Sequence, residues 1–362
     1  MQKNFGLEIA RSIAIILVVI AHLSPFFKNN PVFFNLLYNS GLYGVELFFV
    51  LSGFLIGKTI LTKLTPNFSF KEIINFYVRR LLRIMPLYFV VLVILVFIDN
   101  FIFGSKSLHL LHFVFLQNFF PNEVGFFAVS WTLSIQFWFY LIIPVIFMII
   151  NNAKYSSVKL LRTFIFIIIL INFFRFIYIY LYNPIFDFGV RKNILLRFDS
   201  LFIGVLFAIL KLRFKILYEK FSNFNSFAVS LIVLTVFYFY YVYLMVNYGI
   251  NFFDRSILFR AFSWPLMSLG LIIFVVYLEN NLFINKILIN KKLIYYFFTK
   301  LSMFSFSIFL IHYEIYTYFE NNLKFLNIFL SVITASSIIL IISIMLYNLI
   351  ERPMLLKKSN YK

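Results

Sequence analysis

Two ionisable residues, Arg11 and His22, interrupt an otherwise apolar stretch at residues 7–23. In an α-helix their separation of eleven residues is about three turns, or roughly 16 Å along the axis, so both side chains project from nearly one face. An imidazole can act as a general base, and a guanidinium can hold a phosphate or a developing oxyanion. Since ionisable groups inside lipid are costly, this spacing predicts a functional stripe on one membrane helix.

Two carboxylates in apolar segments are further catalytic candidates. Glu46 lies at a depth that could approach His22, where it would orient one ring nitrogen and so set the tautomer of the other; a structural ion pair is the equally weighted alternative. Asp199 has Arg197 or Arg175 as possible partners, and a plain salt bridge is the favoured interpretation.

A cationic cluster precedes the third apolar run. Arg80 and Arg83 are three residues apart and so share one helical face, with Arg79 before them and Tyr88 after them. Guanidinium groups bind phosphate in a bidentate fashion, which predicts a clamp for an anionic ligand at the cytoplasmic surface. Ordinary positive-inside anchoring is the alternative, and it explains Arg79 well.

Polar and aromatic residues at the start of the fourth apolar run could bind a sugar. Trp131, Ser134, Gln136 and Tyr140 combine rings that stack on sugar faces with groups that bond hydroxyls, although a tryptophan here is often only an interfacial anchor. His312, in the ninth run, is assigned to the same surface, with a hydrogen-bonded packing histidine as the favoured alternative.

The composition shows which elements must position these residues. The chain has 362 residues, of which 63% are hydrophobic and 12% charged, with a mean hydropathy of +0.95, which excludes a soluble globular domain. It predicts one all-α integral-membrane domain over residues 1–362. Ser52 and Gly53 in the second helix are small, so another backbone can approach there. We expect ten membrane helices at residues 7–26, 41–61, 80–99, 126–149, 162–182, 194–210, 226–247, 260–279, 301–320 and 327–349.

The loop charges predict the orientation. With both termini in the cytoplasm, the inner segments hold 20 basic residues and the outer segments hold 8. The net charge of +19 therefore reflects membrane orientation, and nucleic-acid binding is not expected.

Without cysteine there is no thiolate nucleophile. His109 and His112 could seat a metal, but no third ligand is evident, so none is predicted. The outer segment 100–125 is expected to contain a short interfacial helix at residues 108–119.

Taken in order, these motifs resemble the acyltransferase-three family of bacterial integral-membrane acyltransferases. The first helix of that family has the form L-D-x-x-R-A-x-A followed by V-x-x-x-H, which here is carried by Leu7, Glu8, Arg11, Ala14 and His22. The further matching elements are Phe48–Ile56, Arg79–Tyr88, Arg197–Gly204, Ser305 with Phe309, Leu310 and His312, and Glu351–Pro353. One departure is that Gln136 and Phe137 stand where the family commonly has carboxylates.

The resemblance implies transfer of an acyl group, most often acetyl, from cytoplasmic acetyl-CoA to a hydroxyl of a cell-surface polysaccharide or glycolipid. Arg80 and Arg83 would meet the donor phosphates, Arg11 and His22 would line the route, and His22 would act as general base or form an acyl-histidine. The expected location is the bacterial cytoplasmic membrane, with multiple passes, membrane lipid as a partner and no appended extracytoplasmic domain. The alternatives are a transporter or flippase of a lipid-linked sugar, or a family member that has lost catalysis.

Overall fold

The computed structural model describes residues 4–63, 69–102, 104, 107–120, 125–152, 156–249, 251–287, 290–323 and 327–357. Within these ranges the regular structure is helical throughout, without a strand, so the predicted all-α class is confirmed. Basic residues used above to predict the orientation that lie outside the described ranges are Lys106, Lys154, Lys324, Lys358 and Lys362.

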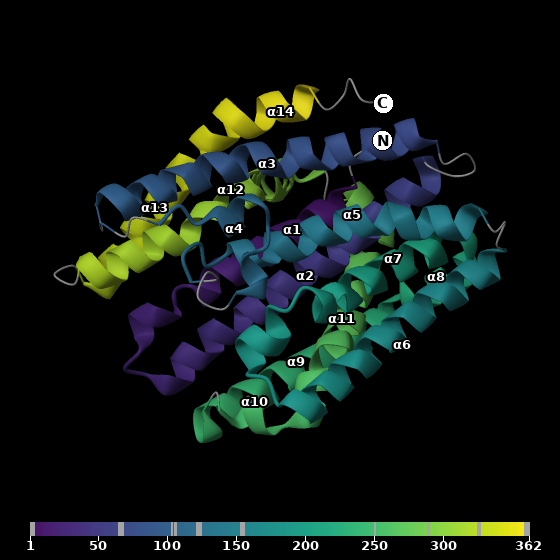
Figure 1. Ribbon diagram of the computed structural model, residues 1–362, viewed down its shortest axis with the longest axis horizontal. Helices are drawn as coiled ribbons and strands as arrows, with labels where there is room; N and C mark the ends of the chain where they lie inside the picture. The colour runs from purple at the N-terminus through teal and green to yellow at the C-terminus, as the bar shows by residue number, and fades with distance from the viewer. Residues whose placement is uncertain are drawn as a thin grey trace. The chain divides into compact units, whose positions relative to one another are not determined.

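The long helices correspond to the predicted apolar runs (Figure 1). They are α1 (Phe5–Ala21), α2 (Pro31–Lys63), α3 (Phe70–Phe101), α5 (Ser130–Asn152), α6 (Ser157–Tyr182), α7 (Phe198–Arg213), α9 (Phe224–Tyr248), α11 (Ile257–Asn280), α12 (Lys292–Asn322) and α13 (Ile328–Leu346). The short helices are α4 (Leu110–Phe113), α8 (Lys215–Phe221), α10 (Asn251–Arg255) and α14 (Arg352–Lys357). Short 3₁₀ or π-helical turns are η1 (Ser24–Phe27), η2 (Gln117–Phe119), η3 (Phe186–Arg191), η4 (Leu195–Arg197), η5 (Phe283–Ile287) and η7 (Tyr347–Glu351).

Eight helices in the described part of the chain are long and apolar enough to cross a membrane. The other two predicted spans are α1 and α7, which have 17 and 16 residues. A multi-pass helical membrane protein is therefore what the structure contains, and the count of ten crossings stays a prediction.

Several helices begin earlier than their apolar runs. The second helix was expected from residue 41 but α2 begins at Pro31, and the third was expected from residue 80 but α3 begins at Phe70. A capping box explains the start of α3, because Ser69 and Glu72 satisfy each other's backbone N–H groups. Hydropathy identifies only the part of a helix that lies in lipid, whereas capping residues decide where it ends. The segment expected to form one short helix at residues 108–119 contains two shorter helical turns instead, α4 and η2, with Phe115 at a φ of 58° between them.

The chain forms two compact units that are interleaved in sequence. Unit 1 comprises Met1–Lys63, Asn152–Arg191 and Leu195–Ser305, and its centre is α2, which contacts α1, α7, α9 and α11. Small residues allow this close packing: a Cβ at Gly44 would lie 2.7 Å from the Ala14 carbonyl oxygen of α1. A Cβ at Gly53 would overlap the Leu201 backbone of α7, so the predicted close approach is confirmed at Gly53.

Unit 2 comprises Leu64–Asn151, Lys192–Ile194 and Phe306–Lys362. Within it, the Tyr77 hydroxyl of α3 donates to the Leu141 carbonyl of α5 at 2.9 Å. The Ser307 hydroxyl of α12 donates to the Glu351 carboxylate at 3.1 Å, and α14 packs against α3. These contacts hold helices from the middle and the end of the sequence in one bundle.

Candidate active site

α1 carries Arg11 of the predicted stripe, and His22 directly follows its last residue. The helix starts at an Asn4 cap, whose side chain accepts from the Leu7 amide, and ends at Ala21 rather than at the expected residue 26. His22 is therefore the residue that closes the helix, and its own amide donates to the carbonyls of the last turn. Arg11 and His22 are both half-buried. The imidazole consequently sits at the end of a helix, where the chain turns into η1.

Side chains in the first half of α12 form hydrogen bonds with Arg11 and Glu8 of α1. The Arg11 guanidinium donates to Ser302 Oγ at 3.3 Å. Thr299 donates to the buried Glu8 carboxylate at 2.7 Å, one turn earlier on each helix. These partners fix the rotation of α1 and so the direction in which Arg11 projects. The sequence does not reveal these partners, because a serine or threonine in an apolar helix does not indicate which residue its hydroxyl faces.

Glu46 forms an ion pair with Arg197, as the second of the two expectations for this carboxylate has it. α1 and α2 run antiparallel, with Gly41 against Ala21 and Gly44 against Ala14. In this register Glu46 lies about six residues, or roughly 9 Å along the axis, away from the level of His22. The alternative of a structural ion pair is what the structure contains.

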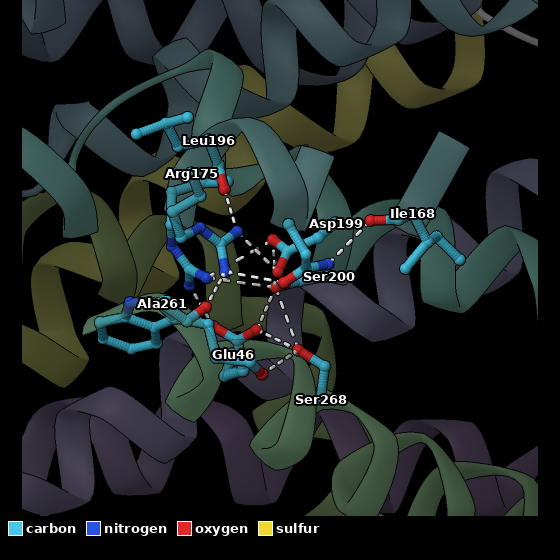
Figure 2. A network of polar contacts seen from close by, with 11 residues as sticks. Glu46, Ile168, Arg175, Leu196, Asp199, Ser200, Ala261 and Ser268 are labelled. Carbon is cyan, nitrogen blue, oxygen red and sulfur yellow. Dashed lines mark hydrogen bonds and ion pairs between the residues drawn. The ribbon is translucent and has the colours of Figure 1, made fainter. Parts of the chain in front are cut away.

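The partners of Glu46 form a buried network in unit 1 (Figure 2). Arg197 forms an ion pair with the Glu46 carboxylate, and the hydroxyls of Ser200 and Ser268 donate to it. The side chains come from α2, η4, α7 and α11, and all of them are fully buried. The Arg197 guanidinium also lies 4.1 Å from the ring centre of Trp264.

Asp199 completes the network through two arginines. Its carboxylate lies 2.7 Å from Arg175 Nη2 and 3.7 Å from Arg197 Nη1, so both predicted partners are confirmed. Arg175 also donates to the Ala261 carbonyl at 3.0 Å. Two guanidinium groups thus face the carboxylates of Asp199 and Glu46, so the four charges sum to zero. Hydrogen bonds within this group offset the cost of burying the charges.

The arginine cluster lies on α3 in unit 2. Arg79, Arg80 and Arg83 are each partly exposed. The Arg80 guanidinium is 5.9 Å from the ring centre of Tyr140, whose hydroxyl donates to Gln136 Oε1 at 3.1 Å. The sequence predicts a phosphate clamp for the arginines and a sugar surface for α5, yet Arg80 lies against Tyr140, which in turn bonds Gln136.

Three other predicted residues are packed in the interior of unit 2. The Tyr88 hydroxyl donates to the His112 carbonyl at 2.9 Å, and Ser134 donates to the Phe115 carbonyl at 2.6 Å. Trp131 is buried, and its carbonyl accepts from the side chain of Asn118. These contacts fasten the segment containing α4 and η2 to α3 and α5.

His312 is fully buried in α12. Its Nδ1–H donates to the carbonyls of Phe309 at 2.8 Å and Ile308 at 3.1 Å, which leaves the lone pair of a neutral ring on Nε2. The favoured alternative of a hydrogen-bonded packing histidine fits this arrangement. In the part of the chain that the structure describes, no three His, Asp or Glu side chains gather into a metal site.

The fold and these polar groups define a multi-pass helical membrane protein with ionisable side chains held inside its helical units. A family model for an acyltransferase domain matches residues 4–348, nearly the whole chain. The chain therefore belongs to this acyltransferase family, and the resemblance drawn from the motifs is confirmed.

Three relatives illustrate the family. An uncharacterized protein of Haemophilus influenzae is 34% identical over 191 residues, covering 46% of this chain and 74% of that protein. A peptidoglycan O-acetyltransferase, OatA, of Listeria monocytogenes is 29% identical over 164 residues, covering 40% of this chain and 25% of that protein. A putative acetyltransferase, ORF330, of Acidianus two-tailed virus is 30% identical over 160 residues, covering 43% of this chain and 45% of that protein. No solved structure matches the chain.

Proposed function

We propose that this membrane acyltransferase moves an acetyl group from cytoplasmic acetyl-CoA to a hydroxyl of a cell-surface polysaccharide or glycolipid in the bacterial cytoplasmic membrane. The observation that carries the proposal is the family match over residues 4–348, which includes the Arg11–His22 pair. Its similarity to a protein named as a peptidoglycan O-acetyltransferase supports both the acetyl group and a glycan acceptor.

In the proposed chemistry His22 acts as general base. The imidazole takes the proton of the acceptor hydroxyl while the oxygen attacks the thioester carbonyl, and the carbon–sulfur bond then breaks to release the coenzyme thiolate. Arg11 either stabilises the oxyanion that forms on the carbonyl oxygen or holds a phosphate of the donor. The alternative order has His22 attack first, so that an acyl-histidine passes the group to the acceptor.

The donor phosphates are assigned to Arg80 and Arg83. Both residues are partly exposed, and the contact of Arg80 with Tyr140 holds one of the two guanidinium groups in place. Gln136, fixed through the Tyr140 hydroxyl, retains its amide hydrogens as donors to a bound ligand.

Radiolabelled acetyl-CoA tests this function with the purified protein and surface glycan. We expect wild-type protein to label the glycan, and His22→Ala to reduce labelling at least a hundredfold, because general-base catalysis typically contributes 10²–10⁴-fold. His109→Ala is the matched control, since His109 is a partly buried histidine whose ring pairs with Asp99 at 3.1 Å. Labelling by His22→Ala at the wild-type rate would rule out the assignment.

A family member that has lost catalysis is the second candidate, and Gln136 is the observation that favours it. Amide nitrogen and oxygen can bind a hydroxyl but cannot take a proton at neutral pH. No labelling by wild-type protein together with labelling by Gln136→Glu would support that candidate. An O-acetyl content of surface polysaccharide that is unchanged in a deletion strain, with a lipid-linked sugar accumulating, would instead support transport.

A further inference from the structure

A second cationic cluster, outside the residues discussed so far, lies near one end of unit 1. Lys58 of α2 and Lys211 of α7 both pair with the carboxylate of Glu279 on α11. The Lys58 ammonium is 3.1 Å from Glu279 Oε1, and Lys211 contacts Oε2. The carboxylate is fully buried, whereas the two lysine side chains are 28% and 26% exposed. The lysine side chains are therefore partly open to solvent, whereas the carboxylate is not.

The charges in this lysine pair do not balance. Two ammonium groups share one carboxylate, which leaves one positive charge in excess. The hydroxyl of Tyr218 donates to Glu279 Oε2 at 2.6 Å and adds no charge, because burial and the neighbouring carboxylate raise the pKa of Tyr218. Each ammonium carries three hydrogens, of which the contact to Glu279 uses one. The exposed side thus offers hydrogen-bond donors and a net positive charge.

This arrangement differs from ordinary positive-inside anchoring. Anchoring lysines extend into water or along lipid, as Lys215 does with 84% of its side chain exposed beside Glu219. In contrast, Lys58 and Lys211 are held close together by the buried carboxylate of Glu279. That carboxylate supplies one negative charge for two ammonium groups, and a second anion on their exposed side would balance the other.

The cluster lies on the Arg11 side of the stripe in α1. The Asn4 side chain, which caps α1, donates to the Glu279 carbonyl at 2.9 Å. Gly6 packs directly against the Leu278 carbonyl, where a Cβ would overlap it. From Asn4 to Arg11 is seven residues, or roughly 10 Å of helix. The lysine pair therefore lies near the end of α1 that carries Arg11, and farther from the end at His22.

We propose that Lys58 and Lys211 form a phosphate-binding site. Glu279 contacts both lysines on their buried side, and the ligand would bind on the exposed side. The ligand is a phosphate monoester or diester, and two sources supply that chemistry at a membrane surface: a phosphate group of the acyl-CoA donor other than those assigned to Arg80 and Arg83, and the headgroup of an anionic phospholipid. The first source rests on the proposed function, and the second does not.

Binding to the purified full-length protein in phosphatidylcholine nanodiscs tests the site. Coenzyme A and dephospho-coenzyme A are titrated by calorimetry, and retention of phosphatidylglycerol is measured by native mass spectrometry. We expect Lys58→Gln and Lys211→Gln each to weaken coenzyme A binding about tenfold, and Lys58→Arg to restore it. Lys215→Gln is the matched control and should change binding less than twofold. Thermal unfolding confirms that each variant is folded.

The outcomes separate the site from the function. Weaker coenzyme A binding in the glutamine variants identifies the donor as the ligand, whereas loss of phosphatidylglycerol alone identifies the lipid headgroup. Unchanged affinity for both in folded variants overturns the site, even if the protein transfers acetyl groups. Conversely, absence of acetyl transfer by wild-type protein would overturn the proposed function while leaving a phosphate site detected by binding intact.

Discussion

At the residue scale, Tyr140 has two separable contacts. Its ring lies under the Arg80 guanidinium at 5.9 Å, and its hydroxyl donates to Gln136. If Arg80 holds the donor, the ring matters more than the hydroxyl, because a cation–π contact is worth about 0.5–2 kcal/mol. We expect Tyr140→Phe to keep the Kd for coenzyme A within threefold, and Tyr140→Leu to raise it by roughly threefold to thirtyfold. Equal effects of both variants would show that the hydroxyl, through Gln136, is what holds the ligand.

The buried carboxylate Glu46 gives a second prediction at this scale. Glu46→Gln removes the charge that faces Arg197, and breaking a buried pair in this way costs about 3–5 kcal/mol because one charge remains uncompensated. Thermal unfolding should show a clear loss of stability. Glu219→Gln, which removes an exposed carboxylate 3.7 Å from Lys215, should change it by less than about 1 kcal/mol. Unchanged stability with a large fall in kcat would instead support the catalytic role predicted from sequence.

The two carboxylates also show how far sequence could predict the site. Asp199 lies two residues from Arg197, so their spacing in the sequence was enough to predict that they pair. The structure contains this ion pair. The partner of Glu46 depends on how α2 packs against α7, where Gly53 lies against the Leu201 backbone, and spacing along one helix does not contain such a contact. Arg80 and Tyr140 were each identified, but their meeting depends on how α3 and α5 pair.

At the element scale, the crossing of α2 and α7 depends on two glycines. A Cβ at Gly53 would overlap the Leu201 backbone, and one at Gly204 would lie 2.6 Å from the Phe54 amide nitrogen. We expect Gly53→Ala and Gly204→Ala to lower the free energy of unfolding by about 1–3 kcal/mol, since backbone atoms cannot move aside cheaply. Gly125→Ala is the control, because no atom lies within 4 Å of its Cβ position. Similar stability of all three variants in thermal unfolding would mean that the helices can separate without cost.

Helix positions were predictable at this scale, but helix ends were not. All ten apolar runs became helices because runs of this length have no other way to satisfy their backbone in lipid. Their ends depend on local groups, such as the Ser69–Glu72 capping box, that hydropathy does not measure.

At the scale of the whole molecule, the orientation is the prediction on which the assignment of donor and acceptor sides depends. Loop charges favour both termini in the cytoplasm. On that basis the exposed Asn29 and Gly125 face outward, whereas the exposed Lys71 and Lys215 face the cytoplasm. The four positions lie in both units, so each unit receives one marker for each side.

Single cysteines at these positions test the orientation directly. The chain contains no cysteine of its own, so no native cysteine has to be replaced first. We expect a membrane-impermeant maleimide to label Asn29→Cys and Gly125→Cys in intact cells, and to label Lys71→Cys and Lys215→Cys only after permeabilisation. Labelling with a denatured sample controls for expression of each variant. The opposite pattern would place Arg11 on the outer side and His22 on the inner side, and the donor could then no longer approach from the end of α1 that carries Arg11.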